Sequence, residues 1–468
     1  MSLHLAGCLR GCLPSGLFVL IAISLAQPAT AQLSGQALTH ALDSAARAHV
    51  ESPIIPGVSV AVVRGGEVLL QRGYGFVDLE WGVRTPAEGD ASYEIGSVTK
   101  QFTAAAILLL AEEGRIDLDA DVTEYIDFDT RGRSIPVRRL LDHTSGVRSY
   151  TEMSVFETLS KLDLPRDTLV RLVEAEAFDF EPGTAQIYNN SAFFLLGLIV
   201  ESRSGQTYED FVQERLFDPA GMTASYYCDE VAMRDRRAHG YDAVGPERLI
   251  RARYLDHAWP YAAGSLCSTV DDLVKWNQAL HGGRILSDAS YQQMTTAQPL
   301  EDGSSIEYAM GISDGMRGET PVHSHGGGIN GFVSMLAWYP EHQLSVVVLQ
   351  NSTAPPGAGS LASTFADLVL GPTAEPPEQP FTGVLAEFEG TYRGPARGQD
   401  MEIRVEAAGG RLEFTTSGSD VPVVPVYVGD LTWVEDGVRY VFRRDGDRVV
   451  ELRFAGGASH YVLRRTGP

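Results

Sequence analysis

The sequence predicts an α/β fold, in which one antiparallel sheet is covered by helices and carries an inserted helical region, followed by a small C-terminal β-barrel. Strand-like apolar runs near 56–80 and 332–349 enclose a middle region with helical patterns, which predicts the sheet and its helices. About eight short alternating segments, separated by Gly-Gly and Asp-Gly turns, fit within 385–468 and predict the barrel.

The expected elements of the first part follow from periodicity and turn residues. Val58–Val63 and Val68–Leu70 flank Gly65-Gly66, a pattern typical of a hairpin. An apolar helix is expected from Ser97 to about Glu113, because its apolar residues lie on every side. The other expected elements are helices over 137–141, 192–202, 270–280 and 360–370 and a second hairpin with strands over 332–338 and 344–349.

Composition divides the chain into four parts. Residues 1–31 combine Arg10 with a short apolar stretch and the small residues Ala29-Thr30-Ala31. This composition predicts a secretory signal peptide cleaved after about Ala31, and hence a secreted or periplasmic protein without a membrane anchor. The remaining parts are expected to be a sheet-and-helix domain, a Pro/Glu-rich linker and the β-barrel, over 32–371, 372–384 and 385–468.

Charge and cysteine content limit the possible partners. With 61 acidic and 37 basic residues the chain has a net charge of −24, which disfavours nucleic acid and anionic membranes as partners. Cys228 and Cys267 remain after signal removal, and the sequence leaves open whether they pair or stay as two buried thiols. Neither has metal-ligand spacing, and we expect no metal or cofactor. The oligomeric state stays open.

Ser97 and Lys100 carry the most chemical information. Residues three apart share one face of a helix, so the serine hydroxyl and the lysine amine can meet. A serine becomes a nucleophile when a neighbouring base takes its proton, and a lysine serves as that base when burial lowers its pKa. The chain has only three lysines, Lys100, Lys161 and Lys275, and otherwise uses arginine. This usage favours a need for a titratable amine at position 100.

Two further segments hold candidate site residues. Tyr188 and Asn190 precede an apolar helix, where the tyrosine can relay protons and the asparagine can hold a substrate amide. The alternatives are a surface aromatic and a helix cap. His325 precedes Gly326-Gly327-Gly328, and glycines beside a strand let a ligand approach the backbone. The alternatives here are a glycine-rich turn or a metal-binding pair with His323.

In this order, the three segments resemble the serine β-lactamase and penicillin-binding protein superfamily, whose motifs include S-x-x-K. More specifically, they resemble its class C-type branch of D,D-carboxypeptidases, D-aminopeptidases and esterases. The resemblance extends from about Pro56 to Asn351, and the C-terminal module resembles the lipocalin-like barrels found in that branch. Framing segments support it, over 140–146, 216–222 and 263–269.

The resemblance implies a role for each residue of the first two segments. Ser97 is implied to be the acylated nucleophile and Lys100 its proton acceptor. Tyr188 is implied to be a base that helps activate Ser97 and later the deacylating water. Asn190 is implied to bind the amide carbonyl of the substrate.

The third segment departs from the family pattern. His325 and Gly327 fill the third motif, where most β-lactamases have a lysine that holds the carboxylate of the antibiotic. The implied oxyanion hole consists of the N–H groups of Ser97 and Gly328. Because a histidine is only partly protonated near neutral pH, we expect slow or absent β-lactamase activity.

The resulting hypothesis is a secreted serine hydrolase that forms an acyl-enzyme on Ser97. Its favoured activity is that of a D-amino-acid-type peptidase or amidase, or of a D,D-carboxypeptidase. The substrate is expected to be a small molecule or a peptide, with peptidoglycan-derived peptides as one candidate class. Within the same fold the alternative is a carboxylesterase or a weak β-lactamase. The alternative of another class is a penicillin-binding sensor or scaffold without turnover.

An α/β-hydrolase is disfavoured. In that fold a glycine-rich oxyanion motif such as His325-Gly326-Gly327-Gly328 precedes a G-x-S-x-G nucleophile elbow, and we expect no such elbow anywhere in this chain. His143 lies near Ser145, but both belong to a framing segment of the resemblance, and we assign them a structural role.

Overall fold

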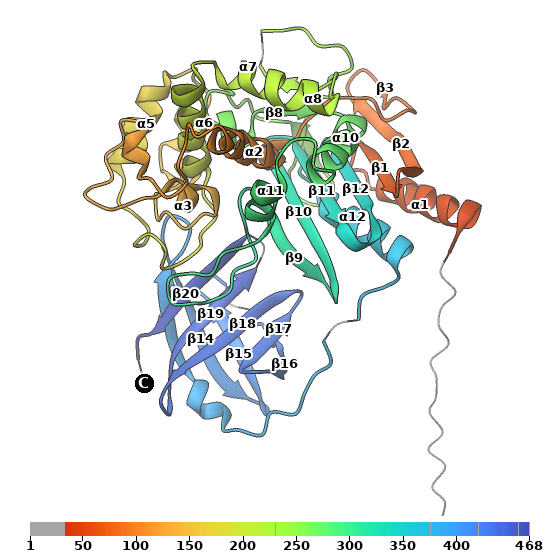
Figure 1. Ribbon diagram of the computed structural model, residues 1–468. Coiled ribbons are helices and arrows are strands. Elements are labelled where there is room, and N and C mark those ends of the chain that lie inside the picture. Colours follow the sequence, from red (N-terminus) through yellow and green to blue (C-terminus); the bar gives the residue numbers. More distant parts are fainter. Residues whose placement is uncertain (1–32, 230, 375, 420, 457, 468) are drawn as a thin grey trace, which may run out of the picture. The chain divides into compact units, whose positions relative to one another are not determined.

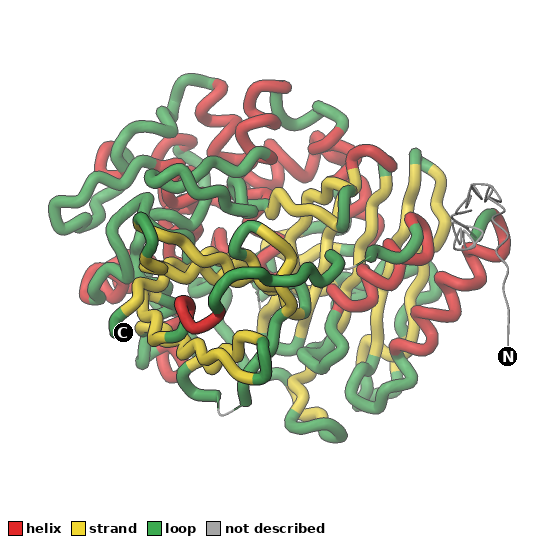
Figure 2. The backbone as a smooth tube through the Cα atoms, turned by 90° about the horizontal axis from the view of Figure 1, so that it is seen from below, coloured by secondary structure: helices red, strands yellow, loops and turns green. Residues whose placement is uncertain are grey.

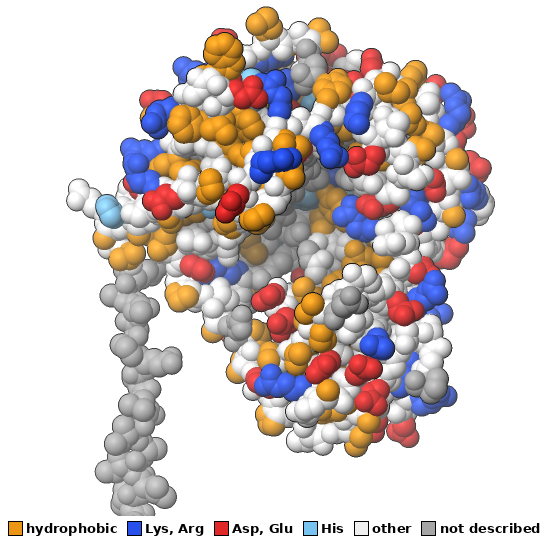
Figure 3. All heavy atoms as spheres, turned by 180° about the vertical axis from the view of Figure 1, so that it is seen from behind, with side chains coloured by type: hydrophobic (Ala, Val, Ile, Leu, Met, Phe, Trp, Pro, Cys, Tyr) orange, Lys and Arg blue, Asp and Glu red, His pale blue; other side chains and the backbone are white. Residues whose placement is uncertain are grey.

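The structure is a computed structural model, and it describes residues 33–229, 231–374, 376–419, 421–456 and 458–467. The predicted signal peptide, 1–31, lies outside the described residues. No helix in the described part of the chain combines the length and the apolar character needed to cross a membrane. On the face shown in Figure 3, acidic and basic side chains are interspersed over the surface.

A seven-stranded antiparallel sheet forms the centre of the first domain (Figure 1). The two predicted hairpins are confirmed, and they meet in the middle of the sheet, where Val60 lies opposite Val348. In spatial order the strands are β3 (Val83–Arg84), β2 (Glu67–Asp78), β1 (Gly57–Arg64), β12 (Leu344–Gln350), β11 (Phe332–Tyr339), β10 (Thr320–Ile329) and β9 (Ser313–Arg317).

Side chains on β1 alternate between two cores, as the period of two in a strand requires. Val58, Val60 and Val62 share a core with α1 (Gly35–His49) and α12 (Ala358–Leu370), and Figure 2 shows helices lying along the yellow strands. Ala61 and Val63 belong to the larger core on the other face. The α/β class predicted from the sequence is therefore confirmed.

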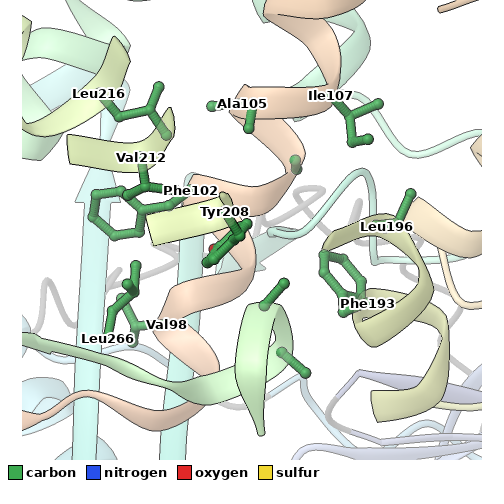
Figure 4. Close-up of a cluster of buried hydrophobic side chains, with 14 of the residues drawn as sticks. Val98, Phe102, Ala105, Ile107, Phe193, Leu196, Tyr208, Val212, Leu216 and Leu266 are labelled. Carbon is green, nitrogen blue, oxygen red and sulfur yellow. The ribbon is translucent and has the colours of Figure 1, made fainter. Parts of the chain in front are cut away.

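The middle of the chain supplies most of the helices. The predicted apolar helix is α2 (Thr99–Glu112), which follows a 3-10 turn over Gly96–Val98 and is buried from Thr99 to Leu110. Figure 4 shows Phe102 and Ile107 of this helix among side chains from its neighbours. The other helices of this region are α3 (Val137–Leu141), α4 (Phe156–Leu159), α5 (Arg166–Ala175), α6 (Asn190–Ser204), α7 (Tyr208–Val212), α8 (Asp218–Ala220), α9 (Tyr261–Gly264), α10 (Val270–His281) and α11 (Asp288–Thr295).

Short strands lie between these helices and support the start of α2. In the sheet of three strands, β8 (Leu266–Ser268) lies between β4 (Tyr93–Glu94) and β5 (Tyr226–Tyr227). A separate pair joins β6 (Tyr241–Ala243) to β7 (Leu249–Arg251).

The C-terminal domain is an eight-stranded antiparallel sheet that curls into a half-barrel, which confirms the small β module of about eight strands predicted there. Its core is aromatic, with Tyr392, Phe414, Trp433 and Phe442 buried together. Starting from β15, the spatial order is β15 (Arg411–Thr416), β14 (Asp400–Ala408), β13 (Gly390–Pro395), β20 (Ser459–Arg465), β19 (Arg448–Gly456), β18 (Val438–Asp445), β17 (Thr432–Glu435) and β16 (Val426–Gly429).

The end of the predicted linker packs against this half-barrel. The ring of Phe381 lies 5.0 Å from that of Tyr427 and 5.5 Å from that of Trp433, measured between centroids. Gln379 donates two hydrogen bonds to the backbone of β16, one from its main-chain N–H and one from its side-chain amide. Composition alone did not indicate this packing, because one aromatic in a Pro/Glu-rich stretch gives no periodic signal.

The structure resolves the pairing of Cys228 and Cys267, which the sequence left open. Cys228 and Cys267 form a disulfide that spans 39 positions of sequence. Cys267 lies in β8, whose Leu266 carbonyl accepts a hydrogen bond from the Ile95 N–H at 2.9 Å. The disulfide therefore fixes a strand that contacts the residues just before Ser97.

Replacing both cysteines by alanine should lower the free energy of unfolding by about 3–4 kcal/mol, because a cross-link of this loop length restricts the unfolded chain by roughly that amount. Urea denaturation of the wild type and the double variant measures the change. A reductant should destabilise the wild type and leave the double variant unaffected. Because Cys8 and Cys12 add two thiols to the full chain, the pairing would be contradicted by four titratable thiols in its denatured, unreduced state, or by two in a chain without residues 1–31.

Candidate active site

Ser97 lies in a tight turn at the N-terminal end of α2. Gly96, just before it, has φ +50°, and a Cβ at this position would lie 2.9 Å from the backbone nitrogen of Gly328 in β10. A larger residue would push β10 away and strain the turn. Glycine at position 96 thus lets β10 approach the candidate nucleophile closely.

The same close approach explains the glycines of β10. A Cβ on Gly327 would lie 2.0 Å from the carbonyl oxygen of Ile95, and Ser334 of β11 donates a hydrogen bond to that oxygen at 2.8 Å. The structure therefore brings together the backbones of Ser97, Gly327 and Gly328, the residues predicted around the oxyanion hole. The oxyanion role itself stays a prediction.

The Lys100 amine is buried and has three oxygen neighbours. Its Nζ lies 2.8 Å from Asn190 Oδ1, 2.8 Å from the Ala263 carbonyl oxygen and 3.1 Å from Ser97 Oγ. The amide and carbonyl oxygens only accept hydrogen bonds. A neutral amine donates its two N–H groups to them, which leaves its lone pair for the Ser97 hydroxyl.

Electrostatics favour that neutral form. Burial is the main cause that lowers the pKa of Lys100 well below its ordinary value, and the positive charge of Arg397 lowers it further. The lysine thus has the properties of a base poised to accept the serine proton.

Asn190 is held beside Lys100 rather than used as a helix cap. The residue that caps α6 is Asn189, whose side-chain oxygen accepts from the Ala192 N–H at 2.8 Å. Asn190 is therefore available to contact Lys100, and its Nδ2 lies 3.4 Å from Thr151 Oγ1. The alternative that Asn190 caps the helix is therefore wrong, because the capping residue is its neighbour Asn189.

Tyr188 covers the amine with its ring. Lys100 Nζ lies 4.8 Å from the ring centroid, and the hydroxyl is buried without a hydrogen-bond partner among the described residues. The surface-aromatic alternative is therefore wrong. Burial raises the pKa of Tyr188, and the neighbouring Ser97 hydroxyl and Arg397 oppose only part of that rise. A protonated phenol is a weak base, which favours Lys100 over Tyr188 as the first acceptor of the serine proton.

His325 is a neutral, buried imidazole. Its Nδ1 lies 2.6 Å from the Gly326 carbonyl oxygen, which fixes this nitrogen as the donor. Nε2 then accepts from the Tyr308 hydroxyl at 2.9 Å. Burial, and secondarily Lys100, lower the pKa of His325 to about 3. His325 therefore supplies no positive charge at neutral pH. His323, its suggested metal partner, stacks on His281 with 5.9 Å between centroids.

The framing segment that contains His143 supports the Tyr188 ring. His143 Nδ1 accepts from the Asn189 N–H at 3.2 Å, and its ring lies 4.4 Å from that of Tyr188 and 4.5 Å from that of Tyr308. Its Nε2 has no hydrogen-bond partner within the described chain, so no triad with Ser145 is formed. These contacts agree with the structural role assigned from the sequence.

The C-terminal domain also reaches the site. The Gln186 and His460 backbones exchange two hydrogen bonds, and the Tyr188 N–H donates to Ser459 Oγ at 3.2 Å. The guanidinium carbon of Arg397 lies 5.8 Å from the centroid of the Tyr188 ring. Sequence reasoning missed Arg397 and Tyr308, because neither belongs to a motif and both meet the site only through tertiary contacts.

A G-x-S-x-G pattern does occur upstream of the glycine strand, at Gly311-Ile312-Ser313-Asp314-Gly315. A nucleophile elbow places its serine on a turn from a strand into a helix. Ser313 instead begins β9 and pairs with Ser324 of β10. The α/β-hydrolase alternative thus lacks the local structure that it requires.

An antiparallel sheet covered by helices, with a buried lysine against a serine at the start of the central helix, defines a serine hydrolase of the β-lactamase type. The chain belongs to the Beta-lactamase family, whose sequence model matches residues 42–370. This finding confirms the resemblance stated from the motifs.

Known proteins narrow the class further. The chain is 30% identical over 318 residues to a D-aminopeptidase of Brucella anthropi, a match that covers 68% of this chain and 59% of that enzyme. The D-amino acid amidase of Ochrobactrum anthropi SV3, solved with L-phenylalanine, superposes with a TM-score of 0.62 at 26% identity and covers 71% of this chain and 97% of its own. An octameric penicillin-binding protein homologue from Pyrococcus abyssi reaches a TM-score of 0.62 at 26% identity, over 90% of this chain and 99% of its own.

The neutral state of His325 has a measurable consequence for stability. Between pH 6.5 and about 3 the unfolded chain binds a proton at this histidine and the folded chain does not, so stability falls as the pH falls. The wild type should lose about 2 kcal/mol of unfolding free energy between pH 7 and pH 5 from this group. His325→Gln should lose correspondingly less. Urea denaturation at both pH values measures the difference.

The comparison needs two checks. Asp142, whose pKa burial raises to about 6, acts in the opposite direction but is present in both proteins. Replacing the exposed His40 by Gln is the matched control and should leave the wild-type pH dependence in place. Equal pH dependence of the wild type and His325→Gln would contradict a neutral, buried histidine.

Proposed function

We propose that the protein is a secreted serine hydrolase that cleaves amide bonds of D-amino-acid-containing substrates through an acyl-enzyme on Ser97. The observation that carries this proposal is the buried Lys100 amine, 3.1 Å from Ser97 Oγ and with its pKa lowered by burial. A scaffold would have no need for an amine kept neutral at this position, whereas a penicillin-binding sensor would use the same base to acylate Ser97 and is separated by the turnover assay below. The secretion part of the proposal is supported by the composition of residues 1–31.

Acylation follows from the geometry. Lys100 Nζ takes the proton of the Ser97 hydroxyl as Oγ attacks the substrate carbonyl carbon and forms a tetrahedral oxyanion. The Ser97 and Gly328 N–H groups are the donors proposed to stabilise this oxyanion. The amide C–N bond then breaks, and the Lys100 ammonium returns the proton to the leaving amine.

Deacylation uses the same base in reverse. Lys100, neutral again, takes a proton from water as the water oxygen attacks the acyl carbon, and the proton passes to Ser97 Oγ as the ester bond breaks. Tyr188, with its ring over Nζ, is proposed to relay this proton. Asn190 keeps the amine in place, and it is also the proposed binder of the substrate amide.

The choice of substrate class rests on two supports. The relatives named D-aminopeptidase and D-amino acid amidase act on D-amino-acid derivatives, as their names state. The neutral His325 lacks the charge with which a third-motif lysine holds a β-lactam carboxylate, which supports low β-lactamase activity. A carboxylesterase shares the same chemistry and is separated by the substrate panel below.

Ser97→Ala should lose at least about 1000-fold in kcat on whichever substrate the wild type cleaves, because the substitution removes the hydroxyl proposed to form the acyl-enzyme. The panel contains D-amino-acid p-nitroanilides, D-Ala-D-Ala peptides, p-nitrophenyl esters and nitrocefin. Ser313→Ala, the serine of the upstream G-x-S-x-G pattern, is the matched control. Full activity of Ser97→Ala on a cleaved substrate would overturn the mechanism. A stable wild-type adduct with penicillin and no turnover of any substrate would favour a sensor.

The pH profile of kcat/KM should have an acidic limb that is caused by protonation of Lys100. Only the neutral amine accepts a proton, so kcat/KM should rise with pH through the pKa of Lys100, which lies well below its usual value of 10.5. Lys100→Ala should lose about 100- to 10,000-fold, and its residual rate should lack that limb. Tyr188→Phe should keep the limb. A limb that disappears in Tyr188→Phe and persists in Lys100→Ala would make the tyrosine the base.

A further inference from the structure

The turn between β13 and β14 carries an arginine from the C-terminal domain to the candidate site. The Arg397 guanidinium carbon lies 5.8 Å from the centroid of the Tyr188 ring, and Lys100 Nζ lies 4.8 Å from the same centroid. Nothing in the chemistry of acylation requires a guanidinium here. Its presence therefore needs an explanation of its own.

Residues of the first domain hold this turn in place. The Gly398 carbonyl accepts a hydrogen bond from Arg148 Nη1 at 3.0 Å. Gly398 has φ +71°, and a Cβ there would lie 2.6 Å from Cβ of Glu152, so the turn fits against the first domain only with glycine. Arg148 is itself paired with the nearly buried Asp179 at 2.5 Å. These contacts hold the turn against the first domain, beside the candidate site.

Arg397 remains accessible at the site. Its Nη2 pairs with Glu152 Oε1 at 2.8 Å, and its side chain is 42% exposed. A guanidinium has five N–H donors, so one contact to Glu152 leaves others for a second carboxylate. Glu152 also accepts a hydrogen bond from Thr151, the residue beside Asn190. The ion pair therefore lies next to the residues proposed to bind the scissile amide.

The charges of the other site residues make this guanidinium important. His325 is neutral, and Lys100 is driven towards its neutral form. An arginine keeps its charge at all relevant pH values. Among the site residues described above, Arg397 is thus the one that stays positively charged. The usual lysine of the third motif, which would supply such a charge, is absent from this site.

We propose that Arg397 is a specificity-determining residue that binds a carboxylate of the substrate close to the scissile bond. This inference rests on the proposed function and names its substrate class as acidic. The carboxylate can come from two sources, the C-terminal residue that leaves or an acidic side chain on the acyl group. Both present the same planar anion to the guanidinium.

The experiment compares matched substrates with the wild type and Arg397→Gln. The first pair is an acylated D-Ala-D-Ala peptide with a free C-terminal acid and its C-terminal amide. The second pair is the p-nitroanilides of D-Glu and D-Gln. The wild type should prefer the acid of at least one pair. In Arg397→Gln the ratio of kcat/KM for acid over amide should fall about 10- to 100-fold, the loss expected for one charged hydrogen-bonding partner. The pair that responds identifies the source of the carboxylate.

Two variants test whether the effect is specific. Arg393→Gln removes the same charge from the same hairpin, where Arg393 pairs with Asp400 at 2.9 Å, and should leave the ratio unchanged. Glu152→Gln removes the competing carboxylate and should raise the ratio. Equal losses on both members of a pair in Arg397→Gln, no acid preference of the wild type, or an equal effect of Arg393→Gln would overturn the proposal.

A separate measurement distinguishes failure of the proposed function from failure of the inference about Arg397. Labelling of Ser97 by a fluorophosphonate, followed by mass spectrometry of the intact protein, reports on the nucleophile without a substrate carboxylate. If labelling and turnover are intact while the acid-to-amide ratio does not depend on position 397, only the inference about Arg397 fails. If the wild type is neither labelled nor active, the proposed function fails, and the inference about Arg397 fails with it because it rests on that function.

Discussion

The burial of the Lys100 amine is the constraint on which the rest of the site depends. An ammonium without water or a carboxylate partner is costly, whereas a neutral amine needs only two acceptors. Those acceptors come from α6 and α9, through Asn190 Oδ1 and the Ala263 carbonyl, so two helices must pack against α2 before the amine is satisfied. The protonation state that the fold tolerates best is also the state that activates Ser97. Stability and chemistry therefore favour the same arrangement.

Close backbone packing around Ser97 is the second constraint. β8 contacts Ile95 from one side, and β10 approaches Gly96 so closely that neither Gly96 nor Gly327 has room for a side chain. The turn is thus held between two strands, one of which is fixed by the disulfide. A serine held in this way keeps its orientation without help from the substrate, which is what preorganised catalysis requires.

Much of this could be predicted from the sequence, because the signals are local. The i, i+3 spacing of Ser97 and Lys100 and the apolar run after them identify both the helix and the pair of reacting groups. Asn190 shows the limit of such reasoning, since Asn189 and Asn190 are equivalent as capping residues until the helix start is known. Tyr308 and Arg397 lay beyond prediction, because their contacts with His325 and Tyr188 depend on tertiary folding and on the docking of a second domain. The C-terminal domain was predicted as a barrel and is a half-barrel. The alternating pattern of a sequence indicates how many strands form, but it does not determine whether the sheet closes.

The position of positive charge links the two domains. A lysine in the third motif, as most β-lactamases have, would lie on the sheet of the first domain. Its positive charge would then not depend on the C-terminal domain. Here β10 contributes the neutral His325, and the charge beside Tyr188 comes from a turn of the half-barrel. A carboxylate that binds Arg397 would bind only while that turn is docked against Arg148 and Glu152. By linkage, such a ligand must stabilise the docked state by the same factor by which docking raises its affinity. The C-terminal domain is then a component of substrate recognition, and its attachment and the acidity of the substrate are coupled properties.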